Sequence, residues 1–340
     1  MEEQTQETAV VQNEEKPTSF IQKYSWIIAA SLGLLAILFL LGTVVNYTIK
    51  LDDGTKITTD IHLWDYFKGE YAFDWSMYIT LGLIVLGIVF ALLHQVNSGF
   101  DSAAGMTFVL AIPMLALSRE FFSNNSIENL KSVSFGWGSA VSIACCIGAF
   151  IFSVSASFSN ETIKTKDIAE DGILIAAAFI LNLVKIPVAT GGGSINFQML
   201  PLFLIALRRG HAHGLVCGGI IYGLITCLTD GWGFATYPFD YLIGFGSVMV
   251  IGYFKKFIFS SEQKGYNIKG EVFILIACML ATIIRFVGST ASSMIVYGLD
   301  LKGAMIYNAI YIPVSGAIAT AVLMAAYGPL TIINNRYPVK

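Results

Sequence analysis

Residues 26–45 read WIIAASLGLLAILFLLGTVV, a run of twenty residues without a charged side chain. A helix that crosses the hydrocarbon core of a bilayer needs about 20 predominantly apolar residues. The apolar region of a secretory signal peptide spans only about 7–15 residues, and an acidic tail precedes the run in this chain. We therefore expect a first membrane span or signal anchor here rather than a cleaved leader.

The composition of the whole chain indicates the same environment. Of its 340 residues, 55% are hydrophobic and 13% are charged, and the mean hydropathy is +0.69. An average soluble domain carries about 25% charged residues, so lipid is the expected solvent for much of this surface. The net charge of −3 and the lack of a basic tract predict no nucleic-acid partner. The five cysteines lie in apolar runs, which favours buried thiols over disulfides or a zinc ligand set.

Ten apolar stretches are candidates for membrane spans. They cover about 25–47, 77–97, 103–118, 134–157, 171–189, 195–208, 212–229, 236–254, 271–296 and 303–327. Two of them, 103–118 and 195–208, are short, and each could be tilted, partly re-entrant or longer than these bounds. The predicted fold is an all-α integral membrane protein with about ten transmembrane helices, of which the last six form a C-terminal bundle.

Basic residues set the expected orientation, because cytoplasmic loops carry an excess of Lys and Arg. With the N-terminus inside, the predicted inner loops hold Lys164, Lys166, Arg208, Arg209, Lys255, Lys256, Lys264, Lys269, Arg336 and Lys340. The outer loops near 190, 230 and 300 hold little beyond Lys185 and Lys302. We expect an even number of spans and both termini in the cytoplasm.

Polar segments divide the chain. The stretch 158–170 is the most polar interior segment on the predicted inner side, and the outer loop 48–76 contains the turn signal Asp52-Asp53-Gly54, where a small hairpin fits. The expected parts are a disordered cytoplasmic tail (1–23), a four-helix membrane region of unknown role (24–160) and a six-helix domain (161–340).

The densest cluster of informative residues is 230–241, which reads DGWGFATYPFDY. Asp240 stands at the start of an apolar span, where a carboxylate is expensive unless it faces a cavity or a partner. Aromatic rings around a carboxylate, such as those of Trp232, Tyr237 and Tyr241, suit an organic cation. Two alternatives compete with a binding site: interfacial Trp and Tyr are common, and a carboxylate is also stabilised at a helix N-terminus.

Other polar residues lie within the apolar spans. Arg285 is some fifteen residues into the span 271–296, where it could pair with Asp240 or reach the outer interface. Ser289 follows it on the outer half of the same helix. Tyr307 and Asn308 begin the last such group, and a buried Asn can hydrogen-bond either a ligand or a neighbouring helix.

Two glycine-rich segments each allow two interpretations. Gly191, Gly192 and Gly193 precede Ser194-Ile195-Asn196 on the outer side. They could form a plain flexible turn, or they could let a ligand approach the backbone. The loop is not a phosphate-binding loop, because no Walker A motif occurs in the chain, and the chain should therefore not hydrolyse ATP. The second segment has glycines at 214, 218, 219 and 223, which favours close helix packing or a face that slides against a partner.

The nearby His211 and His213 do not share a helix face, and we expect no metal there.

Four segments together resemble a known family. They are GGGSINFQMLPLFLIALRRG at 191–210, HGLVCGGIIYGLI at 213–225, YPFDYLIGFGSVMVIGYF at 237–254 and YNAIYIP at 307–313. In this order, over about residues 170–335, they resemble the membrane-embedded substrate-binding subunits (S components) of energy-coupling factor vitamin transporters, and among these the thiamine-specific ThiT family. The N-terminal four helices carry no such resemblance.

The resemblance implies a six-helix domain that binds a vitamin near the outer face of the plasma membrane, under a loop that acts as a lid. It implies a binding subunit rather than an enzyme, without a cofactor. It also implies partners, namely a transmembrane coupling subunit and two cytoplasmic ATPase subunits. In such systems, small residues of the first helix contact the coupling subunit, and Gly172, Ala176 and Ala177 could serve here.

Single positions can be carried over from the family. Asp240 matches the acidic residue that faces the thiamine cation, Tyr241 follows it, and Asn308 matches an Asn of the last helix. The chain departs from the family at Ser289, where a His is frequent, and in having Asp rather than Glu as the carboxylate. The expected ligand is thiamine or a thiamine precursor, bound by Asp240, Tyr241, Trp232, Tyr237, Asn308, Tyr307, Ser289 and Asn196.

Other functions stay open at this point. The same kind of subunit could take another vitamin, such as riboflavin or pyridoxine, but a neutral ligand would leave Asp240 unexplained. A membrane hydrolase is disfavoured because the four His are scattered along the chain. A structural scaffold predicts no ligand and a partner bound mainly by the N-terminal four helices.

Overall fold

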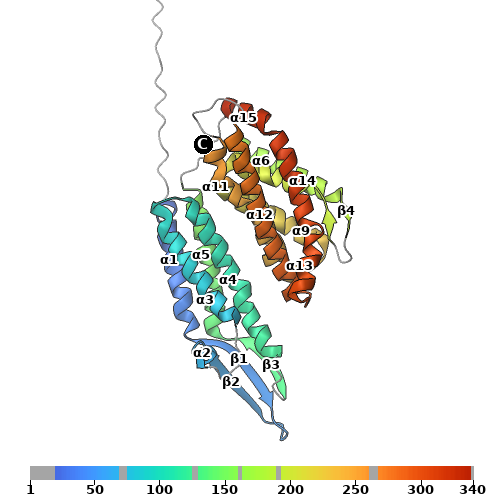
Figure 1. Ribbon diagram of the computed structural model, residues 1–340. Helices are drawn as coiled ribbons and strands as arrows, with labels where there is room; N and C mark the ends of the chain where they lie inside the picture. Colours follow the sequence, from blue (N-terminus) through green and yellow to red (C-terminus); the bar gives the residue numbers. More distant parts are fainter. Residues whose placement is uncertain are drawn as a thin grey trace, which may run out of the picture.

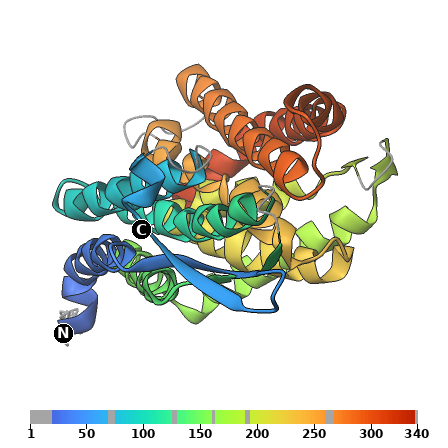
Figure 2. The same cartoon turned by 90° about the horizontal axis from the view of Figure 1, so that it is seen from below.

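The computed structural model describes residues 20–68, 75–124, 129–159, 163–188, 193–259 and 267–337. Two groups of helices lie side by side (Figure 1, Figure 2), and each surrounds its own cluster of buried hydrophobic side chains. Residues 1–19 of the predicted tail lie outside the described residues. A helix already begins at Phe20, inside the segment that the sequence predicts to be disordered.

Four long helices build the N-terminal group: α1 (Phe20–Leu40), α3 (Trp75–Leu92), α4 (Gly99–Asn124) and α5 (Trp137–Ser157), with the short η1 (Leu93–Gln95) between α3 and α4. Gly33 of α1 and Gly87 of α3 both lie against the ring of Phe108 on α4. Small residues thus let three helices approach one another closely. Large side chains such as Leu38 and Val85 stay exposed on the outside of the group, as expected for a surface that faces lipid.

A three-stranded antiparallel sheet covers one end of this group, seen at the lower end of Figure 1. Its strands are β1 (Thr43–Lys50), β2 (Lys56–His62) and β3 (Leu130–Phe135), in the order β2-β1-β3, and α2 (Asp65–Lys68) follows β2. The hairpin between β1 and β2 turns at Gly54, which has φ +86°, and the Asp53 carboxylate accepts a hydrogen bond from the backbone N–H of Thr55. The prediction from the sequence allowed for this hairpin, but it missed β3. It also placed the end of the first span at 47, whereas α1 ends at Leu40 because the next residues join the sheet.

The C-terminal group has more and shorter elements. They are α6 (Thr165–Leu183), β4 (Ile186–Pro187), β5 (Ser194–Ile195), α7 (Met199–Arg209), α8 (His211–His213), η2 (Gly214–Tyr222), α9 (Gly223–Asp230), η3 (Phe234–Thr236), η4 (Tyr237–Ile243), α10 (Gly244–Gly246), α11 (Met249–Ile258), α12 (Ile268–Ile295), α13 (Leu301–Ala309), α14 (Ile312–Ala325) and α15 (Tyr327–Arg336). Of these, η2 and η4 are π-helical. Wide π-helical turns are rare and often occur at functional sites.

The all-α integral membrane class is confirmed. Eight helical segments of the described chain are long and apolar enough to cross a bilayer. The two remaining predicted spans correspond to α6 and α7. The first two turns of α6 carry Asp167, Glu170 and Asp171, and α7 has 11 residues, or about 16 Å at a rise of 1.5 Å per residue.

The glycines of the η2 segment pack against main chain. Gly218 lies against the carbonyl of Phe245, and Gly219 lies against that of Leu242. A Cβ at either position would come within 3.0 Å of those oxygen atoms, so only glycine permits this approach. The interpretation of this segment as a helix-packing surface is confirmed.

The two groups meet through α4. The Tyr253 hydroxyl donates a hydrogen bond to the Gly99 carbonyl at 2.8 Å, and Ser102 Oγ lies 2.9 Å from His211 Nδ1. The His211 and Tyr253 rings stack at 5.0 Å between centroids. Polar and aromatic contacts near one end of the helices therefore join the N-terminal group to α8 and α11.

Candidate functional site

A cavity of about 310 Å³ opens at the end of the C-terminal group where α9 and η4 meet α12, α13 and the β4–β5 ribbon. Its volume is near the lower limit for ligand pockets in proteins, about 300 Å³. Its lining combines carboxylates, cations, amides and aromatic rings. The lining residues are Asn182, Lys185, Ser194, Asn196, Gln198, Thr229, Asp230, Trp232, Asp240, Tyr241, Phe245, Arg285, Ser289, Ser293, Tyr297, Tyr307 and Tyr311.

Asp240 enters the cavity from the π-helical η4, which starts with Pro238 in its first turn. Proline suits this place because the first helical N–H groups have no partner within the helix. Ser289 and Arg285 of α12 line the same cavity, and the Arg285 guanidinium attracts the Asp240 carboxylate. The carboxylate therefore faces the cavity between η4 and α12.

A second carboxylate, Asp230, lies at the mouth of the cavity at the end of α9. The Tyr241 hydroxyl donates a hydrogen bond to it at 3.3 Å. Gly231 and Gly233 have φ values of +75° and +92°, which glycine adopts without strain. This glycine-flanked turn carries Trp232 at the mouth, where its ring is 45% exposed.

Two cations balance the two carboxylates. Arg285 is 8% exposed, and its guanidinium lies over the ring of Phe245, 4.8 Å from the centroid. It therefore stays inside the group instead of reaching the outer interface, one of the two positions considered for it. Lys185 lies on the opposite side, next to β4, and attracts Asp230.

Side-chain amides form the deeper wall of the cavity. Asn196 Nδ2 donates to Asn182 Oδ1 at 3.3 Å, and the Tyr222 hydroxyl donates to Gln198 Oε1 at 2.6 Å. The backbone N–H of Asn196 donates to Ser315 Oγ on α14. These bonds fix the orientation of the amides, so they present a defined pattern of donors and acceptors.

The β4–β5 ribbon lies beside the cavity and contacts α13. Ile186 pairs with Ile195 and Pro187 pairs with Ser194, and the backbone N–H of Gly193 donates to the Tyr307 hydroxyl at 3.0 Å. Gly191 and Gly192, the other glycines of this loop, lie outside the described residues. On the same rim, partial burial and then the charge of Asp240 raise the pKa of Tyr297, which keeps its hydroxyl neutral and able to donate.

The structure brings together six of the eight candidate ligand residues. Asn196, Trp232, Asp240, Tyr241, Ser289 and Tyr307 line the cavity. Tyr237 stacks on Phe234 instead, with centroids 5.2 Å apart, and its hydroxyl donates to the Gly219 carbonyl. Asn308 is fully buried between α13 and α12, where its Nδ2 donates to Ser293 Oγ at 3.0 Å.

Several lining residues were not among the candidates. Asn182 and Gln198 lie in apolar segments, where a side-chain amide is costly without a partner. That cost could have indicated from the sequence that both residues face a polar site. Tyr297 and Tyr311 had no such signal, because tyrosine is common at membrane interfaces.

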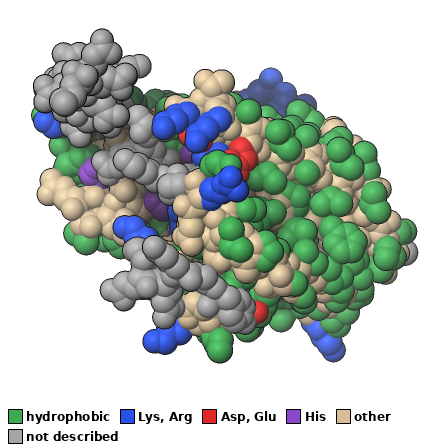
Figure 3. All heavy atoms as spheres, turned by 90° about the horizontal axis from the view of Figure 1, so that it is seen from above, with side chains coloured by type: hydrophobic (Ala, Val, Ile, Leu, Met, Phe, Trp, Pro, Cys, Tyr) green, Lys and Arg blue, Asp and Glu red, His purple; other side chains and the backbone are tan. Residues whose placement is uncertain are grey.

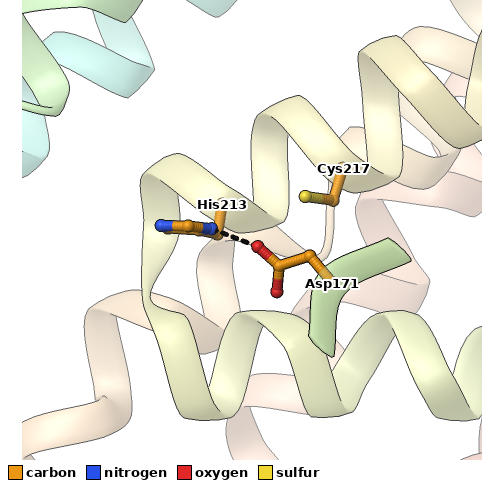
Figure 4. Close-up of side chains that lie close together, drawn as sticks. All are labelled: Asp171, His213 and Cys217. Carbon is orange, nitrogen blue, oxygen red and sulfur yellow. Dashed lines mark hydrogen bonds and ion pairs between the residues drawn. The ribbon is translucent and has the colours of Figure 1, made fainter. Parts of the chain in front are cut away.

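A second polar cluster lies at the opposite end of the same helices. Arg209 donates to Asp167 and Glu170 of α6, and Arg208 also pairs with Glu170. One turn further, the Asp171 carboxylate is hydrogen-bonded to His213, with Oδ2 2.6 Å from Nδ1, and Cys217 points toward both (Figure 4). Among the described residues, Asp171, His213 and Cys217 are the group whose side chains could hold a metal ion.

Residues 168–335 match the family model described as thiamine transporter protein. The chain is also similar to the thiamine transporter ThiT of Bacillus subtilis (strain 168), with 28% identity over 177 residues, which cover 48% of this chain and 91% of that protein. No solved structure matches. The matched region contains the cavity and, apart from Asp167, the second polar cluster, whereas α1–α5 lie before the part matched by the family model.

Proposed function

Since residues 168–335 form a ThiT-like domain of the thiamine transporter family, we propose that the cavity beside Asp240 binds thiamine or a thiamine precursor for uptake. Asp240 within a ring of aromatic side chains is the observation that carries the proposal. A flat organic cation gains from a carboxylate and from stacking on aromatic faces. The similar B. subtilis protein is named as a thiamine transporter.

The two ends of the cavity suit the two rings of thiamine. Asp230, Trp232 and Tyr241 at the mouth offer negative charge and aromatic faces. Asn196 and Gln198 at the deeper wall offer the donors and acceptors that a nitrogen heterocycle requires. A neutral vitamin would use the amides but would leave Asp240 without a counter-charge from the ligand.

We further propose that the domain is the S component of an energy-coupling factor transporter. Gly172 and Ala176 are exposed on α6, and no neighbouring atom lies within 4 Å of a Cβ added at Gly172. Ile173 and Ile180 extend this exposed apolar face. It offers a transmembrane coupling subunit a close approach, and ATP would be hydrolysed by two cytoplasmic ATPase partners.

The proposed orientation places both termini in the cytoplasm of the cell. Seen from the end at which α15 lies, Lys and Arg side chains gather on the surface while hydrophobic side chains cover the flank (Figure 3). The cavity lies at the other end, which would face outward. Lys255 and Lys256 in the last turn of α11 belong to the basic end, in keeping with the positive-inside rule.

A titration of the purified full-length chain tests the ligand. Thiamine should quench the tryptophan fluorescence in a saturable manner, and Asp240→Asn should weaken binding about 10- to 100-fold, the value of a charge-assisted interaction. Asp60→Asn, the same change at an exposed position of β2, is the matched control. Unchanged affinity in Asp240→Asn would remove Asp240 from the site. Saturation by riboflavin or pyridoxine but not by thiamine would replace the ligand.

Co-purification tests the energy coupling separately. Wild-type protein should retain a coupling subunit and ATPase subunits when it is isolated from its native membrane. Ala176→Leu on the exposed face should weaken that association and leave thiamine binding intact, because α6 carries this side chain away from the cavity. Ile168→Leu on the same helix is the control. Thiamine binding without any ATPase partner would refute the coupling and keep the binding function.

A further inference from the structure

Asp171, His213 and Cys217 converge in the interior of the C-terminal group (Figure 4). His213 and Cys217 are four residues apart on one helical face, and Asp171 faces them from α6. All three are buried, and their ligand atoms lie within 4.8 Å of one another. The site is at the end of the helices opposite to the vitamin cavity.

We propose that these three side chains form a zinc site that joins α6 to η2. Carboxylate oxygen, imidazole nitrogen and thiolate sulfur are the three donor types that Zn²⁺ takes in proteins. A mixed set with sulfur also disfavours Mg²⁺ and Ca²⁺, which select oxygen ligands. A water molecule or the second carboxylate oxygen of Asp171 would complete four-fold coordination.

Unused hydrogen-bonding capacity supports the proposal. Asp171 Oδ1 is buried and has no hydrogen-bond partner. Arg209 Nε forms an ion pair with this oxygen at 3.7 Å, but it donates no hydrogen bond to it. Arg209 is instead committed to Asp167 and Glu170 through its terminal nitrogens. A buried carboxylate oxygen normally has a partner, and a metal ion would supply one.

The charges of the surrounding cluster point the same way. Three carboxylates, those of Asp167, Glu170 and Asp171, face the two guanidinium groups of Arg208 and Arg209, and Lys166 also attracts Asp167. Asp171 is the buried member to which Arg209 donates no hydrogen bond, and a buried charge without a close partner is costly. A Zn²⁺ ion with a Cys217 thiolate would add one positive charge in total beside this carboxylate. A protonated His213 without metal would do so as well, and this is the competing explanation.

Zinc binding would adjust the present geometry, in which the three ligand atoms lie within 4.8 Å of one another. Bonds of about 2.0–2.3 Å to a tetrahedral zinc place neighbouring donor atoms roughly 3.4 Å apart. The present distance from His213 Nδ1 to Asp171 Oδ2 is 2.6 Å, so binding would replace this hydrogen bond and separate the pair by somewhat less than 1 Å. The ion would then fix α6 beside Gly172, the residue next to Asp171. Zinc binding at this end of the helices would be independent of which vitamin the cavity holds.

Metal analysis of the full-length protein tests the site. The protein is purified without a histidine tag, and its zinc content is measured. Wild type should hold about one zinc per chain, and Cys217→Ser should bind zinc at least about tenfold more weakly, because metal affinity depends on each ligand. Cys278→Ser, an equally buried cysteine on α12, should behave like wild type. Circular dichroism and gel filtration show whether each variant is folded.

Cobalt provides the second measurement. Co²⁺ bound at the site should give a thiolate-to-metal charge-transfer band in wild type and in Cys278→Ser, and no such band in Cys217→Ser. Asp171→Asn keeps the thiolate, so it should need a higher Co²⁺ concentration to reach the same band. Zinc should also raise the melting temperature of wild type and of Cys278→Ser, but not that of Cys217→Ser. Folded wild-type protein without zinc and without the cobalt band would overturn the proposal. So would metal binding that survives Cys217→Ser, and the cluster would then be a His213–Asp171 pair alone.

Discussion

In the N-terminal group the buried polar side chains are mostly serine and threonine, whereas the C-terminal group also buries aspartate, arginine and side-chain amides. The hydroxyls of the N-terminal group mostly bond to main chain nearby, as Thr80 does with the Ser76 carbonyl. Such bonds belong to helix packing in a membrane. Asp101, which pairs with His94, is the exception.

The buried polar groups of the C-terminal group instead join different helices. Arg209 connects α7 to α6, Asn308 connects α13 to α12, and Asn196 connects the β4–β5 ribbon to α6 and α14. Charged and amide groups within a bilayer are expensive and usually have functions. Costly buried polar groups, rather than the number of spans, therefore distinguish the half that holds the proposed binding site from the N-terminal half.

Removal of a buried charge should have the largest effect on stability. Arg209→Met would leave Asp167 without its ion-pair partner and Glu170 with Arg208 alone, in an interior where Arg209 is 4% exposed. We expect the free energy of unfolding in detergent to fall by about 3–5 kcal/mol. Arg336→Met, at an exposed position of α15, should change it by less than about 0.5 kcal/mol. Equal melting temperatures of the two variants would show that the buried network stabilises nothing.

Substitution of Asn308 should have the next largest effect on stability. It also distinguishes a hydrogen bond between helices from a ligand contact, the two roles considered for this residue. Its Nδ2 donates hydrogen bonds to Ser293 Oγ and to the Ala304 carbonyl, and its Oδ1 accepts from the Tyr311 hydroxyl at 2.8 Å. Asn308→Ala should lower the free energy of unfolding by about 1–3 kcal/mol because these groups lose their partner. Thiamine affinity should fall by less than about tenfold, a change of 1.4 kcal/mol. A greater loss of affinity at normal stability would instead make Asn308 a ligand contact.

Much of this architecture follows from the sequence, because apolar length and the cost of a carboxylate act locally. Asp240 stands out at the start of an apolar span without any knowledge of its neighbours. The beginning of α6 does not stand out in this way. The sequence predicted a span that starts at 171, whereas the helix begins at Thr165. Asp167 and Glu170 are tolerated in that helix because Arg208 and Arg209, some forty residues later, neutralise them.

The second polar cluster shows the same limit more sharply. Asp171 and His213 are 42 residues apart, and no local pattern indicates that they face each other. The sequence showed that His211 and His213 diverge, which is correct for that pair. It could not show that His213 meets Cys217 and a residue of another helix. Long-range pairing of this kind depends on the packing of whole helices.

The ribbon beside the cavity should show a moderate effect on ligand kinetics. Tyr307→Phe removes the hydroxyl that accepts from the Gly193 N–H. The loss of one such bond, worth about 0.5–1.5 kcal/mol, should speed thiamine release by up to about tenfold in a stopped-flow measurement. Tyr78→Phe, whose hydroxyl bonds to the Tyr66 carbonyl in the N-terminal group, should leave release unchanged. Identical kinetics of Tyr307→Phe and wild type would mean that this contact does not restrain the ribbon.

The smallest effect is expected inside the N-terminal group, where the comparison predicts that buried polar atoms serve packing alone. Ser142 Oγ on α5 is buried without a hydrogen-bond partner, so Ser142→Ala should change the free energy of unfolding by less than about 0.5 kcal/mol or stabilise the protein. Ser139 on the same helix donates to the Val44 carbonyl at 2.7 Å, and Ser139→Ala should lower that free energy by about 1 kcal/mol. If thermal melts showed Ser142→Ala to be the more damaging of the two, this hydroxyl would have a partner outside the chain, and the N-terminal group would hold a binding surface of its own.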